Sequence, residues 1–529
     1  MSQASRRAFL QQAAALSSLG AASPLGLSLL TMNEAAAQSG PTDYKALVCI
    51  FLYGGNDAYN TVLATDTDSW THYVNHRDPA SRNATDTSTS IALLAPGTTP
   101  NGTAAVGSPA RFGGVLPINH AGRAVHTGRQ FALHPALSQV QQLHQNGRVA
   151  VLANVGPLTR PLTKADYSDI RIRKPAKLFS HNDQQSTWQS FQPEGAGNGW
   201  GGRMGDLLMG MNSSNSAANV DVIRRSFTCM TPGSTSAWLS GQSVMQYQTG
   251  TSSIAGLGSG GKVYGNARLL QAMGNVMANN TASNLYARDH QRFVRRAMDA
   301  SSLLIEKIPV IGAPPWGNAG ITNVYNEPLL RMTVPSTGAT STNPLAIQLQ
   351  MVARLIETNR LGGFGIRRQL FMVSLGGFDT HDNQNQVHGD RLAQLNHAMA
   401  YFDMVLGGMP GGDMRSQVTT FTASDFGRTF TNNGDGTDHG WGSHHFVMGG
   451  AVRGTEVYGT FPQYSTANAQ GVFGSPDQLQ NGVMLPTTSV DQYAYTLGRW
   501  MGVSQSDLLT ILPNLNQFNS SAYDLGFMS

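Results

Sequence analysis

Residues 46–57 read ALVCIFLYGGND and give the strongest indication of the fold class. The run from Ala46 to Leu52 is apolar throughout and ends abruptly at a Tyr-Gly-Gly turn. Continuous apolar runs of this length, rich in Val, Ile, Phe and Leu, are typical of strands buried on both faces of a parallel sheet. Asn56 and Asp57, which follow the turn, are therefore expected at the carboxyl end of such a strand.

The same pattern recurs three times along the chain, each time as a short apolar run that stops at glycine or at polar residues. These runs are Arg148 to Val155, Gln369 to Leu375 and Gln417 to Thr422. Helical patterns lie between the runs, at His134 to Gln145, at Ala267 to Leu304, and at Pro344 to Thr358 with Asn343 as the N-cap. The alternation predicts an α/β layered fold with a parallel or mixed central sheet flanked by helices.

The first 37 residues have the order of an export signal: a basic region, a weakly apolar region and a small-residue cleavage site. Arg6 and Arg7 open the pattern Arg-Arg-Ala-Phe-Leu, which the twin-arginine export machinery reads, and three alanines predict cleavage after Ala37. The alternative is a buried or membrane-anchoring helix, but glycine and proline interrupt the apolar run. We expect export by the twin-arginine route to the periplasm or the outside of the cell.

Residues 38–529 contain no second apolar stretch long enough to span a bilayer, so we expect no integral membrane segment after cleavage. We interpret them as a single domain with a variable insertion at about residues 212–343, where Ser, Thr, Gly, Asn and Pro are frequent. The formal net charge is +4, but the basic residues are scattered, which excludes nucleic acid as the main partner. Cys49 and Cys229 are either one disulfide or two buried thiols.

Acidic residues and histidines follow the predicted strands, where ligands bind in open α/β sheets. They are Asp57 after the first run, Asp379 and His381 after the third, and Asp425 after the fourth. Three carboxylates at one sheet edge would form a strongly anionic pocket unless cations fill it, so the pattern predicts one or two divalent cations. The open alternatives are that Gly-Gly-Asn-Asp is a simple tight turn and that Asp425 is a helix N-cap.

A second motif, TDHGWGSHH at residues 437–445, holds three histidines and one acid. Imidazole with carboxylate suits zinc, whereas a site dominated by carboxylates suits magnesium, manganese or calcium. The first of these histidines, His439, is a candidate ligand. His444 and His445 are interpreted as supporting or packing residues.

The chain resembles the bacterial domain-of-unknown-function family 1501, whose members commonly carry a twin-arginine signal. The matching stretches are Phe51–Asp57, Asn60-Thr61, Leu133–Leu137, Ser180-His181, Trp188, Gly199-Trp200, Phe378–His381, Ser424–Arg428, Thr437–Gly440, Thr488–Asp491 and Trp500. That family is similar in fold to the alkaline phosphatase and sulfatase superfamily, whose members hold two metal ions at the carboxyl edge of the sheet. The resemblance therefore implies an alkaline-phosphatase-like layered domain.

By this resemblance Asp57 is the metal ligand of the first strand, and Asp379 with His381 forms the Asp/His pair of one metal. Asp425 would be a ligand of the other metal, and His439 the late histidine. Two features depart from the superfamily. Phe426 follows Asp425 where a histidine is usual, and neither cysteine lies in the Cys-x-Pro-x-Arg order of formylglycine sulfatases.

The catalytic candidates are Ser180, His181 and Arg428. Ser180 follows the second strand, where the superfamily places its Ser or Thr nucleophile; alternatively it caps the next helix. His181 is a candidate ligand, general acid or first helical residue, and Arg203 and Arg428 are candidates for binding an anionic ester. We expect a metal-dependent hydrolase of phosphate or other anionic esters, acting on a small ester or an envelope polymer. The alternative is a non-catalytic envelope or surface protein that retains the fold and a structural ion.

Overall fold

The computed structural model describes residues 43–82, 89–212, 220–256, 262–278 and 284–529. The predicted signal peptide, residues 1–37, lies outside the described residues. Within these ranges no helix is both long and apolar enough to cross a membrane.

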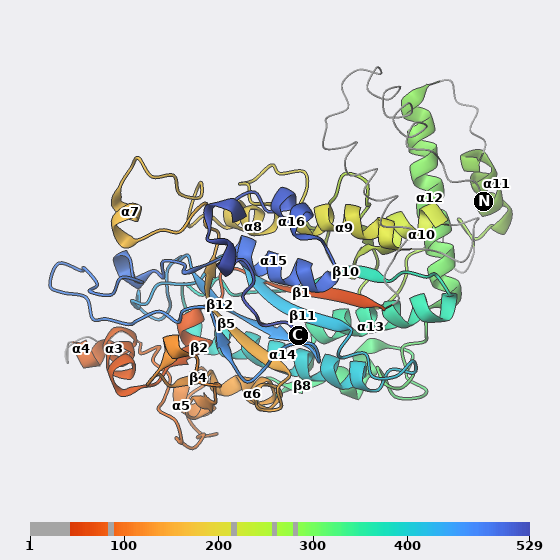
Figure 1. Cartoon of the computed structure of the whole chain (residues 1–529). Coiled ribbons are helices and arrows are strands. Elements are labelled where there is room, and N and C mark those ends of the chain that lie inside the picture. Colours follow the sequence, from red (N-terminus) through yellow and green to blue (C-terminus); the bar gives the residue numbers. More distant parts are fainter. Residues whose placement is uncertain (1–42, 83–88, 213–219, 257–261, 279–283) are drawn as a thin grey trace.

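A central nine-stranded sheet organises the chain (Figure 1). In spatial order its strands are β13 (Val457–Tyr458), β5 (Val149–Gly156), β12 (Ser443–Met448), β11 (Val418–Ser424), β1 (Lys45–Tyr53), β10 (Arg368–Gly376), β6 (Cys229–Thr231) and β7 (Tyr247–Gln248), and β14 (Thr488–Ser489) pairs with β5. Strand β12 is antiparallel to both neighbours, while the other pairings are parallel. The four predicted strands correspond to β1, β5, β10 and β11. The prediction of a mostly parallel central sheet is confirmed.

Strand β1 divides the core into two halves because its successive side chains point to opposite faces. Ala46, Val48 and Ile50 pack into one apolar cluster, with α6 (Ser138–Gln145), α13 (Pro344–Gly362) and α14 (Gln384–Gly407). Leu47, Cys49 and Phe51 pack into the other cluster. The helices on that face are α8 (His181–Ser190), α9 (Trp200–Met211), α15 (Val490–Met501) and α16 (Gln505–Ile511). Figure 1 shows these two helical layers on either side of the sheet.

The predicted helices agree with the structure in two places and differ in one. Helix α6 ends at Gln145 as predicted, and Asn343 caps α13 by accepting hydrogen bonds from the backbone N–H groups of Leu345 and Ala346. The single helix expected at 267–304 is wrong, because the structure has α11 (Ala267–Ala278) and α12 (Leu285–Lys307). Asn284 explains the difference, because its side chain accepts hydrogen bonds from the backbone N–H groups of Tyr286 and Ala287 and so caps a new helix, α12.

The segment expected to be a variable insertion, about 212–343, contributes to the central sheet. Its strands β6 and β7 extend the central sheet beyond β10. The remaining elements are short: α3 (Thr67–Arg77), α4 (Pro79–Arg82), α5 (Pro109–Phe112), α7 (Lys164–Ser168), α10 (Val220–Phe227), β2 (Val62–Ala64), β3 (Leu116–Ile118), β4 (Phe131–Leu133), β8 (Arg331–Thr333) and β9 (Thr340–Thr342).

The two cysteines and two of the histidines considered in the sequence analysis are part of the core. Cys49 and Cys229 are free buried thiols, and burial raises the pKa of both. His444 and His445 are buried on β12, where His444 stacks on Phe461 and His445 on the ring of Tyr493. The interpretation of the two histidines as packing residues is confirmed.

Candidate functional site

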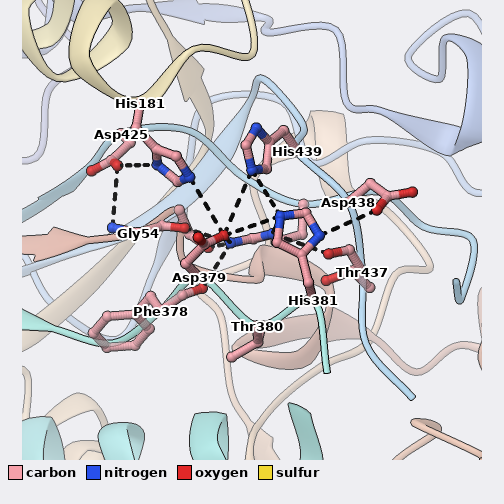
Figure 2. Close-up of polar contacts among 12 residues, drawn as sticks. Gly54, His181, Phe378, Asp379, Thr380, His381, Asp425, Thr437, Asp438 and His439 are labelled. Carbon is pink, nitrogen blue, oxygen red and sulfur yellow. Dashed lines mark hydrogen bonds and ion pairs between the residues drawn. The ribbon is translucent and has the colours of Figure 1, made fainter. Parts of the chain in front are cut away.

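The site residues meet where three parallel strands end side by side. In β1, Leu52 is paired with Leu375 of β10 and with Ser424 of β11, so the segments that follow these strands emerge at one edge of the sheet. Asp379 follows β10 and Asp425 follows β11. Histidines reach the same edge from α8 and from the loop between β11 and β12 (Figure 2).

The turn after β1 needs glycine because other segments approach its backbone closely. Gly54 has a φ of 114°, and a Cβ there would lie 2.4 Å from the backbone nitrogen of Asp379. Gly55 has a φ of 84°, and a Cβ there would lie 2.5 Å from the ring of Phe426. The backbone N–H of Gly54 also donates to Asp425 at 3.2 Å. The glycine pair therefore lets the three strand ends meet.

Three histidine rings direct their Nε2 atoms towards one carboxylate oxygen, Oδ1 of Asp379. The distances to this oxygen are 3.4 Å from His181, 3.2 Å from His381 and 3.6 Å from His439. The Nε2 atoms of His381 and His439 are 2.9 Å apart. Ligand atoms of His181, Asp379 and His439 all lie within 4.8 Å of one another. Figure 2 shows these side chains around one common volume.

The opposite nitrogen of each ring, Nδ1, faces an oxygen acceptor. His181 Nδ1 donates to Asp425 at 2.7 Å, and His439 Nδ1 donates to the backbone carbonyl of Phe179 at 2.6 Å. His381 Nδ1 lies 3.3 Å from Oδ1 of Asp438. Because carbonyl and carboxylate oxygens only accept, these contacts place the proton on Nδ1 of each neutral ring. The Nε2 lone pairs are then left to face Asp379 and one another.

Arg428 fixes Asp379 from the protein interior. Its side chain is fully buried and donates to the carboxylate of Asp379. Its other hydrogen bonds go to the backbone carbonyls of Gly54, Gly55, Phe378 and Thr437. With these acceptors and a 3.5 Å contact to His381, all five N–H groups have protein partners. The structure therefore leaves Arg428 no N–H group for the anionic ester that the sequence analysis expected it to bind.

Asp57 lies outside the group of ligand atoms around Asp379. It is completely buried, and both of its oxygens accept hydrogen bonds from Arg77, whose side chain is also completely buried. The backbone N–H of Tyr59 donates to Oδ1 at 3.1 Å, and Gln384 donates to Oδ2 at 2.5 Å. Of the five proposed metal ligands, the structure brings four to one place: Asp379, His381, His439 and Asp425. Asp425 contacts His181 rather than the common volume. The fifth, Asp57, is paired with Arg77.

The charges around the cluster favour an ionised aspartate. Burial opposes ionisation of Asp379, but the hydrogen bond and charge of Arg428 outweigh it and lower its pKa. The hydrogen bond to Asp425 raises the pKa of His181, while burial lowers that of His439. Asp379 and His381 have side chains 46% and 45% exposed, so the cluster is open to solvent on their side.

Phe426 packs against the histidine rings. Its ring centroid lies 4.7 Å from that of His181 and 4.7 Å from that of His439. The side chain therefore forms an apolar wall against both rings, at the position where Phe426 departs from the superfamily pattern.

Ser180 precedes α8 at the N-cap position, but its hydroxyl does not cap the helix. The hydroxyl donates to Asp183 at 2.8 Å, and no side-chain cap bond is made. Neither of its two proposed roles, nucleophile or capping hydroxyl, is visible in these contacts.

Sequence reasoning missed Gln185, which donates to Asp425 at 2.8 Å. Helical spacing could have revealed it, because residues four apart lie on one helix face and Gln185 follows His181 by four positions. Arg77 gave no comparable signal, since it lies in a polar stretch 20 residues after Asp57.

Comparison with known proteins identifies part of the chain. Residues 333–512 match the model of a family described as protein of unknown function (DUF1501). Over this region the chain is similar to that family, as the resemblance in its sequence predicted. No curated protein matches the chain.

The DUF1501 region supplies Asp379, His381, Asp425, Arg428 and His439, together with β10, β11 and β12. His181 lies outside it, on α8. The candidate site therefore combines the DUF1501 region with an earlier part of the chain.

Proposed function

We propose that this protein is a metal-dependent hydrolase of phosphate or other anionic esters, and that it binds one divalent cation between His181, Asp379 and His439, with His381 beside them. The observation that carries the proposal is the common arrangement of the three histidines. Each ring has Nδ1 held by an oxygen acceptor and Nε2 turned to one carboxylate oxygen. Metal-binding histidines are characteristically oriented in this way.

The donor set fits a cation. At bond lengths of about 2.0–2.1 Å, the ligand atoms of a tetrahedral zinc site lie roughly 3.3 Å apart. The three distances from Nε2 to Asp379, 3.2–3.6 Å, match that spacing. The Nε2 atom of His181 is buried and has no hydrogen-bond partner among the described residues, so a bound cation would satisfy this nitrogen. Three imidazoles with one carboxylate favour zinc over magnesium, manganese or calcium.

A bound cation would supply Lewis-acid chemistry, lowering the pKa of water and polarising an ester oxygen. The protein's own residues would hold the cation's ligands in position. Arg428 keeps Asp379 ionised, while Asp425 and the Phe179 carbonyl orient two of the rings. The half-exposed side formed by Asp379 and His381 leaves room for water and substrate.

The proposal includes one cation rather than two. The second cation implied by the superfamily resemblance would need Asp57, whose four hydrogen bonds already occupy both oxygens. In this proposal Arg77 provides the positive charge that neutralises Asp57.

The alternative is a non-catalytic envelope or surface protein in which the cation is structural. One observation favours it: the guanidinium of Arg428 contacts the same Asp379 oxygen that the histidines face. A cation there would share its carboxylate with a permanent positive charge, which weakens its Lewis acidity. The two functions differ in whether metal-loaded protein hydrolyses esters.

Metal analysis tests the site directly. We expect the purified protein to contain about one equivalent of zinc or a similar cation, held by protein ligands with one position open to solvent. His181→Ala and His439→Ala should lose most of the metal. His290→Ala, which removes an exposed histidine of α12, should retain it. Elemental analysis of the four proteins measures this, and protein that never takes up metal would rule out the proposal.

Activity separates the enzyme from the alternative. Metal-loaded protein should hydrolyse at least one member of a panel of aryl phosphates, phosphodiesters and sulfate esters, and chelation should abolish turnover. Turnover should return when zinc is restored. A full complement of metal without any hydrolysis would support the structural role.

Ser180→Ala tests the nucleophile. Because the Ser180 hydroxyl is bonded to Asp183, we expect turnover and metal content to change little, and stability to fall by about 0.5–1.5 kcal/mol through the lost hydrogen bond. Kinetics and thermal unfolding of the variant measure both. Loss of turnover with metal and stability intact would instead identify Ser180 as a covalent nucleophile.

A further inference from the structure

Helices α11 and α12 form a hairpin that extends away from the central sheet at one end of the molecule (Figure 1). The buried residues of α12, namely Ala300, Ser301 and Leu304, lie in its carboxyl-terminal half. Contacts to α10 and α13 hold the helix there. Among the residues that the structure describes, none forms a covering layer over the amino-terminal half of α12 and much of α11.

Large exposed apolar side chains are concentrated on this hairpin and in the segment just before it. Of the fifteen exposed large apolar residues in the described part of the chain, six lie within a span of thirty residues. They are Tyr264, Leu269, Val276, Leu285, Tyr286 and Phe293. Tyr286 and Phe293 are 84% and 52% exposed and lie seven positions apart, which puts them on one face of α12. Exposed apolar side chains gathered in this way are typical of an interaction site.

Positive charge accompanies the apolar residues. Between positions 262 and 299 the chain has six Lys or Arg and two Asp residues, an excess equal to the formal net charge of the entire chain. Lys262, Arg268 and Arg292 are exposed. Arg292 is 4.0 Å from Asp289, and both of these side chains are more than 60% exposed, so this pair is weakly coupled.

We propose that the α11–α12 hairpin docks onto an anionic lipid surface. Aromatic and aliphatic side chains would enter the boundary between headgroups and acyl chains, and the basic residues would contact the headgroups. A second copy of the chain is a poorer occupant, since an isologous contact would bring two hairpins of the same positive charge together. The proposal is independent of the metal site.

Vesicle binding tests the proposal with the purified chain. We expect cosedimentation with vesicles of phosphatidylcholine and phosphatidylglycerol, and at least about tenfold less with phosphatidylcholine alone. Raising NaCl from about 0.1 to 0.5 M should also weaken binding, because the headgroup contacts are screened. His439→Ala should bind as the wild type does, which separates docking from metal binding.

Variants locate the surface. Tyr286→Glu with Phe293→Glu should reduce binding by about tenfold or more, because both side chains lose their apolar contact. Arg268→Glu with Arg292→Glu should do the same by reversing the charge. Tyr325→Glu is the matched control: Tyr325 is 63% exposed but lies outside the hairpin, so its binding should not change.

Two results would overturn the proposal. One is failure of the wild-type chain to bind anionic vesicles at low salt. The other is concentration-dependent dimerisation that the Phe293→Glu variant abolishes, which would assign the surface to a second copy. Unfolding curves that match the wild type establish that each variant is folded.

Discussion

Replacing Arg77 by Met is expected to lower the free energy of unfolding by about 3–5 kcal/mol, because it leaves the buried carboxylate of Asp57 without its charged partner. Both side chains are completely buried. Arg77 also donates to the backbone carbonyls of Thr429 and Phe430, which would lose their donors. Chemical denaturation at neutral pH measures the change.

The control for this prediction is the exposed pair of Arg171 and Asp169, whose arginine is 86% exposed. Arg171→Met should not change the unfolding curve measurably, since exposed ion pairs contribute little. The double variant Arg77→Met with Asp57→Asn should recover part of the loss, because the unpaired charge is gone. Equal effects of Arg77→Met and Arg171→Met would contradict the interpretation of Asp57 as an ion-paired structural residue.

Acid is expected to unfold the protein well above the pKa of ordinary carboxylates. Burial lowers the pKa of His388 to about 4 and that of His444 and His445 to about 3. An unfolded histidine titrates near 6.5, so between pH 6.5 and 4 the unfolded chain binds protons that the folded chain does not. Stability is therefore fully present above pH 6.5 and is lost as the pH falls through this window.

Together, these three histidines make the free energy of unfolding fall by about 4 kcal/mol for each pH unit. Over a few pH units this loss is comparable to a typical total stability of about 5–15 kcal/mol. Asp491 acts in the opposite direction, because burial raises its pKa to about 6 and its folded form binds a proton first. Its contribution offsets at most one of the three histidines between pH 6 and 4.

Denaturation curves at pH 7.5, 6 and 5 measure this slope. His445→Phe should make this slope shallower by about one proton. Within the described part of the chain the Nε2 atom of His445 has no hydrogen-bond partner, so the ring serves mainly as packing. A free energy of unfolding that stays constant from pH 7.5 to 5 would show that the buried histidines are not neutral in the folded state.

The sequence predicted the sheet because its central strands are buried on both faces, which leaves an uninterrupted apolar run in each. It also predicted that Asp379, His381 and Asp425 would come to one edge, since parallel strands end together. Strand β12 was not predicted, because its segment, SHHFVM, contains two histidines and so is not a continuous apolar run. Their burial depends on the rings of Phe461 and Tyr493, which are distant in sequence.

The partners within the site could not be read from local sequence. Asp425 lies 244 positions after His181, and Phe179, which orients His439 through its carbonyl, lies 260 positions before it. Asp57 had the residue type and position of a metal ligand. Only the tertiary packing of α3 against the turn after β1 brings Arg77 to its carboxylate.

The position of β1 in the sheet has a consequence for biogenesis. This strand is synthesised long before its partner, because it pairs from Lys45 onward with a strand that starts at Arg368. At roughly 5–20 residues per second, its partner leaves the ribosome some 15–60 s later. During that interval a strongly apolar strand has no pairing partner and is exposed to aggregation. The nascent chain is therefore expected to depend on chaperones until β10 and β11, the partners of β1, have been made. Slower translation should lower the yield of folded protein.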